Sequence, residues 1–301
     1  MTEWKEGLMQ QMSDVIARIG NSTVQHGKHN NRLYLMTLSN KDFPNIIDKL
    51  DMMASENGYS KIFAKIPSFA RDRFTENGYR IEASIPRFRD GQEKIYFMCK
   101  YFDRSRMIDD KLEDINKILD VSRSKENILE NNAIKFDLPR GFKYEICDES
   151  HVSQMANLYG KVFATYPFSI DDPEYIRKTM NENFIYFSIK KNDNIVALSS
   201  SEMDTNLQNV EMTDFATLPE YQGKGFALYL LYKMENEMRK RNMQVAYTIS
   251  RSMSYGINIL FAKMGYKYGG TLTNNTNISV IKDIHSLNNF ESMNIWYTRL
   301  Q

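Results

Sequence analysis

The sequence predicts an α/β protein built on a mixed sheet, and two observations carry this prediction. Strand-like runs rich in apolar and β-branched residues alternate with amphipathic helical patterns along most of the chain. One strand-like run, residues 210–218, leads through a turn with two glycines into a helical pattern that reaches about residue 241. Helices that alternate with strands in this way cover the faces of a sheet. We therefore expect an α+β arrangement on a mixed sheet.

The first 138 residues predict a smaller α+β region and a connector. Residues 1–30 are polar and weakly patterned. The patterns that follow predict strands at residues 32–37, 61–66, 79–85 and 94–102, and helices at residues 43–56 and 68–76. Apolar residues at helical spacing predict a connecting helix with one buried stripe within residues 103–130. We place an N-terminal domain at 1–104 and the connecting helix and linker at 105–138.

The third predicted unit is a larger domain at residues 139–301. It opens with a strand at 144–147 and a helix at 151–164, for which Ser150 is the expected N-cap. A short helix at 175–181 follows. The remaining predicted elements are strands at 185–190 and 195–201, the strand 210–218 and its helix, a strand at 245–249, a helix at 255–263, and strands at 266–272 and 293–299.

Composition excludes several classes of protein. The formal charge of the 301-residue chain is +1, with 26% charged residues, so nothing favours nucleic acid or an anionic membrane as a partner. Cys99 and Cys147 are far apart and belong to no metal-ligand pattern. No apolar stretch approaches the length of a membrane span. We expect a cytoplasmic globular protein that binds no metal.

The turn Gln222-Gly-Lys-Gly-Phe-Ala227 predicts an anion site. Backbone N–H groups at the start of a helix are unpaired and lie at the positive end of its dipole, which suits phosphate oxygens. Gly223 and Gly225 let a bulky diphosphate approach the backbone closely. The glycine spacing fits neither a Walker loop nor a dinucleotide-binding fingerprint. The alternative is a βα turn with no ligand.

The spacing Gln222-x-x-Gly225-x-Ala227 resembles the acetyl-CoA pyrophosphate loop of the GNAT N-acetyltransferases. Leu260-Phe-Ala-Lys-Met-Gly265-Tyr266 resembles the end of the second helix of that family, where glycine caps the helix. The predicted order of elements matches the GNAT fold over about residues 140–301. The resemblance implies acetyl-CoA as cosubstrate and transfer of its acetyl group to an amine. It implies cofactor contacts from Phe215, Ala216, Thr217, Gln222, Gly223, Lys224, Gly225, Phe226, Ala227, Ser254 and Asn258.

Glu211 is the candidate general base, because some members of this family carry a catalytic glutamate six residues before the position of Thr217. On an ideal strand, residues 211, 213, 215 and 217 share one face, which would direct Glu211 into the cofactor cleft. Asp214 would face the other way and ranks second, although a bulge would reverse that order. The alternative for Glu211 is a solvated carboxylate. Phe261 occupies the position of the family's usual acid, a tyrosine, so Tyr255 or Tyr229 is the substitute candidate.

The acceptor pocket is expected near residues 163–173, which follow the first helix of the larger domain. Tyr166 and Phe168 could enclose an alkyl chain, or could anchor the loop in the core. Asp214 could pair with an ammonium group and Arg251 with a carboxylate, although solvation of Arg251 is the alternative. Asn275 is a polar candidate in the glycine-containing stretch 269–275. A homodimer is possible.

Two further resemblances concern the whole chain. Phe74 to Tyr79 echoes Phe261 to Tyr266, which suggests that the N-terminal region is a degenerate GNAT-like half without a cofactor loop, unless the similarity is a coincidence of helix, glycine and strand. Segments such as Ser60-Lys-Ile-Phe-Ala-Lys-Ile-Pro67 and Thr165-Tyr-Pro-Phe168 resemble the members of the family that acetylate the terminal amine of β-lysine. This implies a role in making the compatible solute Nε-acetyl-β-lysine under salt stress. Another amine as acceptor, and a CoA-binding sensor without catalysis, stay open.

Overall fold

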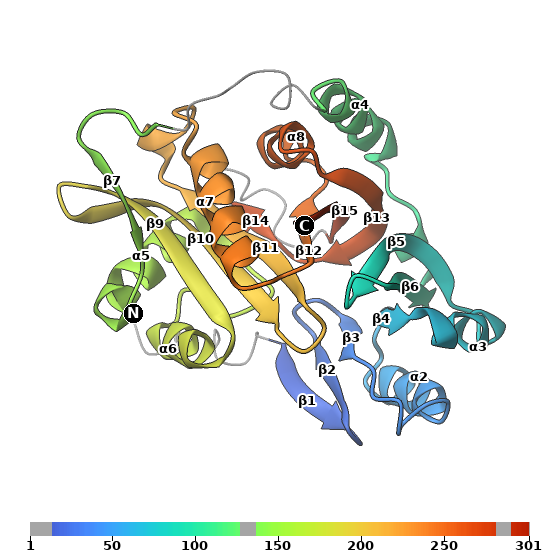
Figure 1. Ribbon diagram of the computed structural model, residues 1–301. Coiled ribbons are helices and arrows are strands. Elements are labelled where there is room, and N and C mark those ends of the chain that lie inside the picture. The colour runs from blue at the N-terminus through green and yellow to red at the C-terminus, as the bar shows by residue number, and fades with distance from the viewer. Residues whose placement is uncertain (1–13, 127–136, 281–289, 301) are drawn as a thin grey trace, which may run out of the picture.

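The computed structural model describes residues 14–126, 137–280 and 290–300. A mixed sheet of 13 strands runs through these residues (Figure 1), with the strand order β1-β2-β3-β4-β6-β5-β13-β15-β12-β11-β10-β9-β7. Strands β1 to β6 form what we call the N-terminal half, and strands β7 to β15 the C-terminal half. The predicted mixed α/β architecture is confirmed, and both halves belong to one sheet.

The N-terminal half confirms every strand and helix predicted between residues 32 and 102, with shifts of a few residues at their ends. Helix α2 begins three residues later than predicted, after the cis peptide bond between Phe43 and Pro44. Two strands were not predicted, because residues 1–30 have little apolar alternation. The elements are β1 (Val15–Ile19), β2 (Ser22–Gly27), β3 (Arg32–Thr37), α2 (Ile46–Glu56), β4 (Lys61–Pro67), η1 (Ser68–Ala70), α3 (Arg71–Glu76), β5 (Arg80–Arg89) and β6 (Glu93–Tyr101).

The connector and the C-terminal half also follow the predicted order. The connecting helix is shorter than predicted, and residues 127–130 of that prediction lie outside the described part. The elements are α4 (Leu112–Arg123), β7 (Phe142–Ile146), α5 (Val152–Val162), β8 (Phe163–Thr165), α6 (Pro173–Glu182), β9 (Phe184–Lys191), β10 (Asn194–Asp204), β11 (Asn209–Thr217), α7 (Phe226–Lys240), β12 (Val245–Arg251), α8 (Tyr255–Lys263), β13 (Lys267–Thr276), β14 (Ser279–Val280) and β15 (Glu291–Arg299).

Ser150 is not the helix cap that the sequence suggested. A single 3₁₀ turn, Glu149–His151, precedes α5, and Asp148 caps it by accepting a hydrogen bond from the backbone N–H of Ser150. The hydroxyl of Ser150 donates to the same carboxylate oxygen, at 2.5 Å. Aspartate and serine are both good caps, so sequence alone does not choose between neighbours.

The two halves repeat one topology. In each, two parallel strands are joined by a helix: β3, α2 and β4 in one half, and β11, α7 and β12 in the other. The second parallel strand then pairs antiparallel with the last strand of its half, which pairs in turn with the strand after the second helix. The rings of Phe74 and Tyr79 meet at 4.9 Å, as do those of Phe261 and Tyr266. The suspected repeat is therefore real at the level of strand order.

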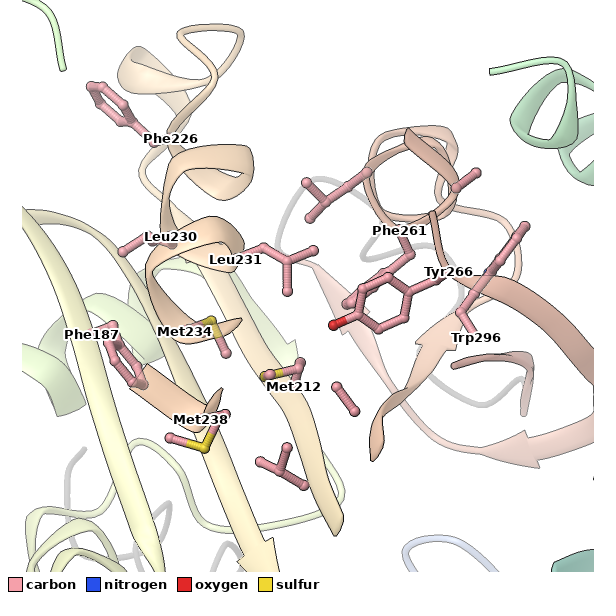
Figure 2. Packing of buried hydrophobic residues seen from close by; sticks show 14 of the residues in the cluster. Phe187, Met212, Phe226, Leu230, Leu231, Met234, Met238, Phe261, Tyr266 and Trp296 are labelled. Carbon is pink, nitrogen blue, oxygen red and sulfur yellow. The ribbon is translucent and has the colours of Figure 1, made fainter. Parts of the chain in front are cut away.

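The sheet continues from one half to the other where β5 meets β13, and the ladder there has one residue pair among the described residues, Ala83 and Gly270. On one face of the C-terminal half, α7 and α8 bury a core against the sheet (Figure 2) that includes Met212, Leu231 and Phe261. Helices α5 and α6 cover the other face of β9 to β11. A third cluster lies between the halves and combines Tyr34 and Phe63 with Tyr247. This last contact brings the N-terminal half against the site described next.

None of the helices in the described ranges is both long and apolar enough to cross a membrane.

Candidate active site

Strands β11 and β12 separate along their length and open a cleft between them. They pair only from Asn209 to Glu211, although β11 continues to Thr217 and β12 to Arg251. The edge of β11 beyond Glu211 therefore has no ladder partner on this side within the described residues. We call the opening the loop cleft. Its volume is about 640 Å³, and it extends from this strand edge to the glycine turn.

The glycine turn has the geometry of an anion cradle. Gly223 and Gly225 have φ angles of 77° and 78°, which residues with a side chain adopt reluctantly. The space where a Cβ atom would lie is open at both positions. Helix α7 begins directly after Gly225, with no side chain capping its first turn and no acidic residue in that turn. Its first N–H groups and the dipole are thus available to phosphate oxygens.

Most of the predicted cofactor-binding residues line the loop cleft. Those that do are Phe215, Thr217, Gln222, Gly223, Gly225, Phe226, Ala227 and Ser254. Lys224 is exposed on the turn and is not part of the lining. Ala216 is buried on the opposite side, in the core beneath α5. Ala216 could therefore serve the cleft only through its backbone atoms.

Asn258 does not lie in the cleft, which corrects the prediction. Its side-chain N–H groups donate to the backbone oxygens of Arg251 and Ser254, at 2.9 and 2.7 Å. Its side-chain oxygen accepts from Asn294 and from the indole of Trp296, at 2.8 and 2.9 Å. The amide is buried and fully used, so Asn258 ties α8 to β12 and β15 instead of binding a ligand.

A β-bulge at Asp214 changes which residues of β11 share a face. Ser200 pairs with Thr213 and Leu198 with Ala216, so two residues of β11 lie opposite Ser199. The bulged residue, Asp214, has a φ of 55°. As a result Phe215 turns toward Phe261 and the α8 core. The prediction that residues 211, 213, 215 and 217 share one face is therefore wrong.

A bulge was the condition under which Asp214 would rank above Glu211 as the candidate general base, and the structure has one. A second cavity, of about 680 Å³, lies between the two halves, and we call it the inner cavity. Glu211 and Asp214 both line it. Asp214 lines the loop cleft as well, whereas Glu211 does not. The two openings thus meet beside Asp214, with Tyr166 and Thr213 also common to both.

Asp214 is held by hydrogen bonds. Its carboxylate accepts from the hydroxyls of Tyr166, at 2.6 Å, and Ser200, at 2.5 Å. Burial raises the pKa of Asp214, and these hydrogen bonds act in the opposite direction. With both oxygens occupied, Asp214 fixes the ring of Tyr166 at the junction and has less capacity to take up a proton from a ligand.

Glu211 has a different environment. It lies directly opposite Glu202 on the neighbouring strand and opposite Tyr247 on β12. Burial and the charge of Glu202 raise the pKa of Glu211 to about 8, against the lowering effects of Lys65 and of a hydrogen bond with Tyr247. The pKa of Glu202 is raised too, first by burial. A carboxyl group that titrates near neutral pH suits proton transfer.

The two most deeply placed cations of the inner cavity come from the N-terminal half. Lys65 on β4 is 3.5 Å from the hydroxyl of Tyr247. Arg32 on β3 is buried and donates to the backbone oxygen of Asn275 at 2.8 Å. The sequence patterns did not single out Arg32, Lys65 or Glu202. The available signal was a charged residue within a mostly apolar strand, as with Lys65 between Ala64 and Ile66.

The remaining predicted residues divide into two groups. Tyr166, Phe168 and Asn275 line the inner cavity, as expected of an acceptor pocket. Arg251 instead lines the loop cleft and pairs with Glu291 at 2.7 Å, so it is not placed to meet an acceptor in the inner cavity. Tyr255 is 50% exposed at the start of α8 and lines neither opening. In the described ranges no group of three metal-ligating side chains is found.

Comparison with known proteins gives the family of this chain. Residues 152–266 match the acetyltransferase (GNAT) family, and the chain belongs to it. It is therefore an N-acetyltransferase. The chain is 42% identical to the beta-lysine N(6)-acetyltransferase of Methanococcus maripaludis, over 94% of this chain and 97% of that one. It is 31% identical to the enzyme of the same name from Methanosarcina mazei, over 84% and 96%. It is 32% identical to the N-acetyltransferase YodP of Bacillus subtilis, over 67% and 69%.

Proposed function

We propose that this protein transfers the acetyl group of acetyl-CoA to the terminal amine of β-lysine and so makes Nε-acetyl-β-lysine. One observation carries the proposal. The identity to the β-lysine enzymes extends over 94% of the chain, and so over both halves that build the inner cavity. Similarity over the C-terminal half alone would support only the loop cleft, which acetyltransferases with many different acceptors have in common. Similarity in both walls of the acceptor cavity supports a shared acceptor.

Three observations support acetyl-CoA as the ligand of the loop cleft. The two glycines of the turn have left-handed backbone conformations with open space beside them, the start of α7 has no side-chain cap, and the edge of β11 beyond Glu211 has no ladder partner on this side among the described residues. The turn at Gln222–Ala227 would hold the diphosphate, and residues 215–217 the pantetheine arm. Bound there, acetyl-CoA supplies the acetyl group as a thioester. The acceptor amine would enter from the inner cavity and meet it at Asp214 and Tyr166, where the two openings join.

Glu211 is the proposed general base. A terminal ammonium has an ordinary pKa near 10.4, so only about one molecule in a few thousand is neutral at pH 7. Glu211 takes the proton from the ammonium, directly or through water. The amine nitrogen then forms a bond to the acetyl carbon as the bond from carbon to sulfur breaks. The nitrogen gives up its second proton to solvent, and the leaving sulfur takes up a proton to become the thiol of CoA. Asp214 holds Tyr166 in place while this happens.

We assign no side chain to protonation of the leaving sulfur. Phe261 is buried in the core and has no proton to give, and Tyr255 faces solvent. A thiolate is a tolerable leaving group near neutral pH, since a thiol has an ordinary pKa of about 8.5. Solvent is therefore sufficient for this step.

The product explains a role as a compatible solute. Acetylation removes one of the two positive charges of β-lysine and leaves a molecule with no net charge, which can accumulate in response to salt. We place this activity in the cytoplasm, where the two buried, free thiols of Cys99 and Cys147 would stay reduced.

The test is acetyl-CoA turnover, followed by thiol release, with β-lysine, α-lysine, spermidine and a lysine peptide as acceptors. The proposal predicts the highest kcat/KM for β-lysine, with the product acetylated on the terminal nitrogen by mass spectrometry. Faster turnover of another amine would keep the fold and cosubstrate and overturn the acceptor. Binding of acetyl-CoA without turnover of any amine would support a sensor.

A further inference from the structure

The inner cavity has walls of opposite charge, and each wall comes from one half. Its buried or half-buried carboxyl groups, Glu202, Glu211 and Asp214, all belong to the C-terminal half. The cations at the same depth, Arg32 and Lys65, belong to the N-terminal half. The other charged residues of the lining, Arg18, Lys178 and Glu182, are exposed at its edge. A ligand that spans the cavity therefore meets acids on one side and cations on the other.

The two cations differ in what they already contact. Lys65 lies beside Tyr247, and the carboxylates of Glu211 and Glu202 act on it across the cavity. Among the described residues, the hydrogen bonds of Arg32 go only to neutral acceptors: the backbone oxygen of Asn275 and, at 3.4 Å, the side-chain oxygen of Gln25. The carboxylate of Asp14 also acts on the charge of Arg32, but it does not line the cavity and accepts a hydrogen bond from Asn30 instead. Lys65 thus faces carboxylates across the cavity, whereas Arg32 has no carboxylate hydrogen-bonded to it.

Arg32 also has unused hydrogen-bonding capacity. A guanidinium carries five N–H donors, and the two hydrogen bonds above use two of them. Its Nε is buried without a partner among the described residues, and so is the side-chain oxygen of the adjoining Asn275. The side chain is 3% exposed and lines the inner cavity. Burying a charge with unused donors is unfavourable unless a partner arrives.

We propose that Arg32 is the residue that binds the carboxylate of the acceptor, so that the N-terminal half selects an amino acid over a simple diamine. A guanidinium binds a carboxylate with two parallel hydrogen bonds. The rings of Tyr34 and Phe63 lie under the guanidinium, with its central carbon 5.4 and 5.6 Å from the ring centroids, and hold it at the cavity wall. This inference rests on the proposed function, because it takes an amino acid with a second amine as the acceptor.

This assignment gives each charge of β-lysine a partner. The carboxylate meets Arg32, and the two amines meet the acidic wall, one of them at the junction with the loop cleft. A polyamine would leave the buried donors of Arg32 without a carboxylate partner, which disfavours its binding. The N-terminal half, which has no glycine loop of its own, thus contributes specificity to a reaction whose cosubstrate binds in the other half.

The test compares two acceptors that differ only in the carboxylate. Pentane-1,4-diamine is β-lysine without its carboxyl group. For the wild-type protein we expect kcat/KM to be higher for β-lysine by on the order of 10²-fold or more. Arg32→Gln should remove most of that preference, mainly through a higher KM for β-lysine, and should change the value for the diamine by less than about threefold. Arg32→Lys keeps the positive charge but lacks the paired N–H groups of the guanidinium. Its preference for β-lysine over the diamine should therefore lie between those of the wild-type protein and Arg32→Gln.

Arg106→Gln is the matched control, because Arg106 is a second buried arginine that lies outside the inner cavity. It donates to the backbone oxygens of Asn30, Asn31 and Asn274, all at 2.7 to 3.0 Å. Its loss should lower activity with both acceptors equally. Thermal unfolding and acetyl-CoA binding of each variant report whether it folds.

Two results would overturn the proposal. One is an unchanged preference for β-lysine over the diamine in both folded Arg32 variants. The other is an equal loss with both acceptors, as in the Arg106 control. If the wild-type protein turned over no β-lysine at all, the proposed function would fail first, and the same two variants would then show whether Arg32 discriminates α-lysine from pentane-1,5-diamine, its counterpart without the carboxyl group.

Discussion

Glu211 combines two properties that rarely coincide in a carboxyl group: it lines an open cavity, and its pKa lies near 8. If Glu211 is the base, kcat/KM should rise with pH through an apparent pKa near 8 in the free enzyme. Glu211→Gln should lower kcat/KM at pH 7.5 by roughly 10²-fold or more and remove this step. In Glu211→Gln a rise toward pH 10 should appear instead, because without the base only the amine that has already lost its proton can react. A pH–rate profile from pH 6 to 10 measures both.

Asp214→Asn is the comparison that separates the two carboxyl groups. It keeps the shape of the side chain but weakens the hold on Tyr166, since the carboxylate accepts a hydrogen bond at 2.6 Å. We expect a lower rate with the step near pH 8 intact. Loss of the step in Asp214→Asn, and its persistence in Glu211→Gln, would make Asp214 the base instead.

The same pKa affects stability. Because the folded-state pKa of Glu211 is raised above its ordinary value of 4.5, its contribution is fully favourable below about pH 4.5 and is lost as pH rises through about 8. Glutamine cannot ionise. Glu211→Gln should therefore unfold at a higher temperature than wild type at pH 9, and the advantage should shrink toward pH 5. Thermal denaturation at the two pH values measures it, and an advantage that is equal at both would contradict the raised pKa.

At the scale of elements, the turn between β11 and α7 is a place where a substitution should affect ligand binding more than folding. A Cβ at Gly225 meets no atom within 4 Å, but its φ of 78° is strained for alanine by about 1 kcal/mol. Gly225→Ala should raise the KM for acetyl-CoA by about 10-fold or more, since the added methyl group lies where the diphosphate approaches. Gly160→Ala in α5, where a Cβ makes ordinary contact with Asp171, is the control. It should leave that KM unchanged and stabilise the helix by up to about 1 kcal/mol.

The order of elements was predictable because periodicity and glycine turns are local signals. Helix Tyr255–Lys263 and strand Arg32–Thr37 were predicted to the residue. The bulge at Asp214 was not, since it depends on how β11 pairs with β10. The hydrogen bonds that remove Asn258 from the cleft depend on β12 and β15 in the same way. The deepest cations of the inner cavity, Arg32 and Lys65, come from about 150 to 180 positions before Glu211, and no local pattern connects them with it.

At the scale of the whole molecule, the two halves share buried polar contacts in addition to the sheet. Lys61 on β4 is buried, donates to the backbone oxygen of Thr273 on β13 at 2.7 Å, and lies 3.5 Å from Glu82 on β5. The carboxylate of Glu82 accepts from the backbone N–H of Thr273 at 3.0 Å. Removing one partner of a buried pair is costly. Because of these contacts we expect the halves to unfold together, although the sequence predicted separate domains at 1–104 and 139–301.

Gly270 provides the test of that coupling. It forms the residue pair that joins β13 to β5, and its φ is 138°. A Cβ there would lie 2.2 Å from the backbone oxygen of Glu82 and 2.6 Å from the Cα of Ala83. Backbone atoms on a neighbouring strand cannot move aside without breaking the junction, so Gly270→Ala should cost roughly 2–4 kcal/mol. For a chain of this size that corresponds to a fall in the melting temperature of about 3–6 °C.

The form of the transition decides whether the halves are one folding unit. Trp296 lies in the core of the C-terminal half, and Trp4 is the other tryptophan of the sequence. In a Trp4→Phe background the fluorescence therefore follows the C-terminal half, while circular dichroism follows both. If the junction couples them, the two probes should report one coincident transition in wild type, and Gly270→Ala should lower both midpoints by the same amount. Two separated transitions would instead mean that the halves fold independently. In that case the opposite charges of the inner cavity would be brought together only after each half had folded.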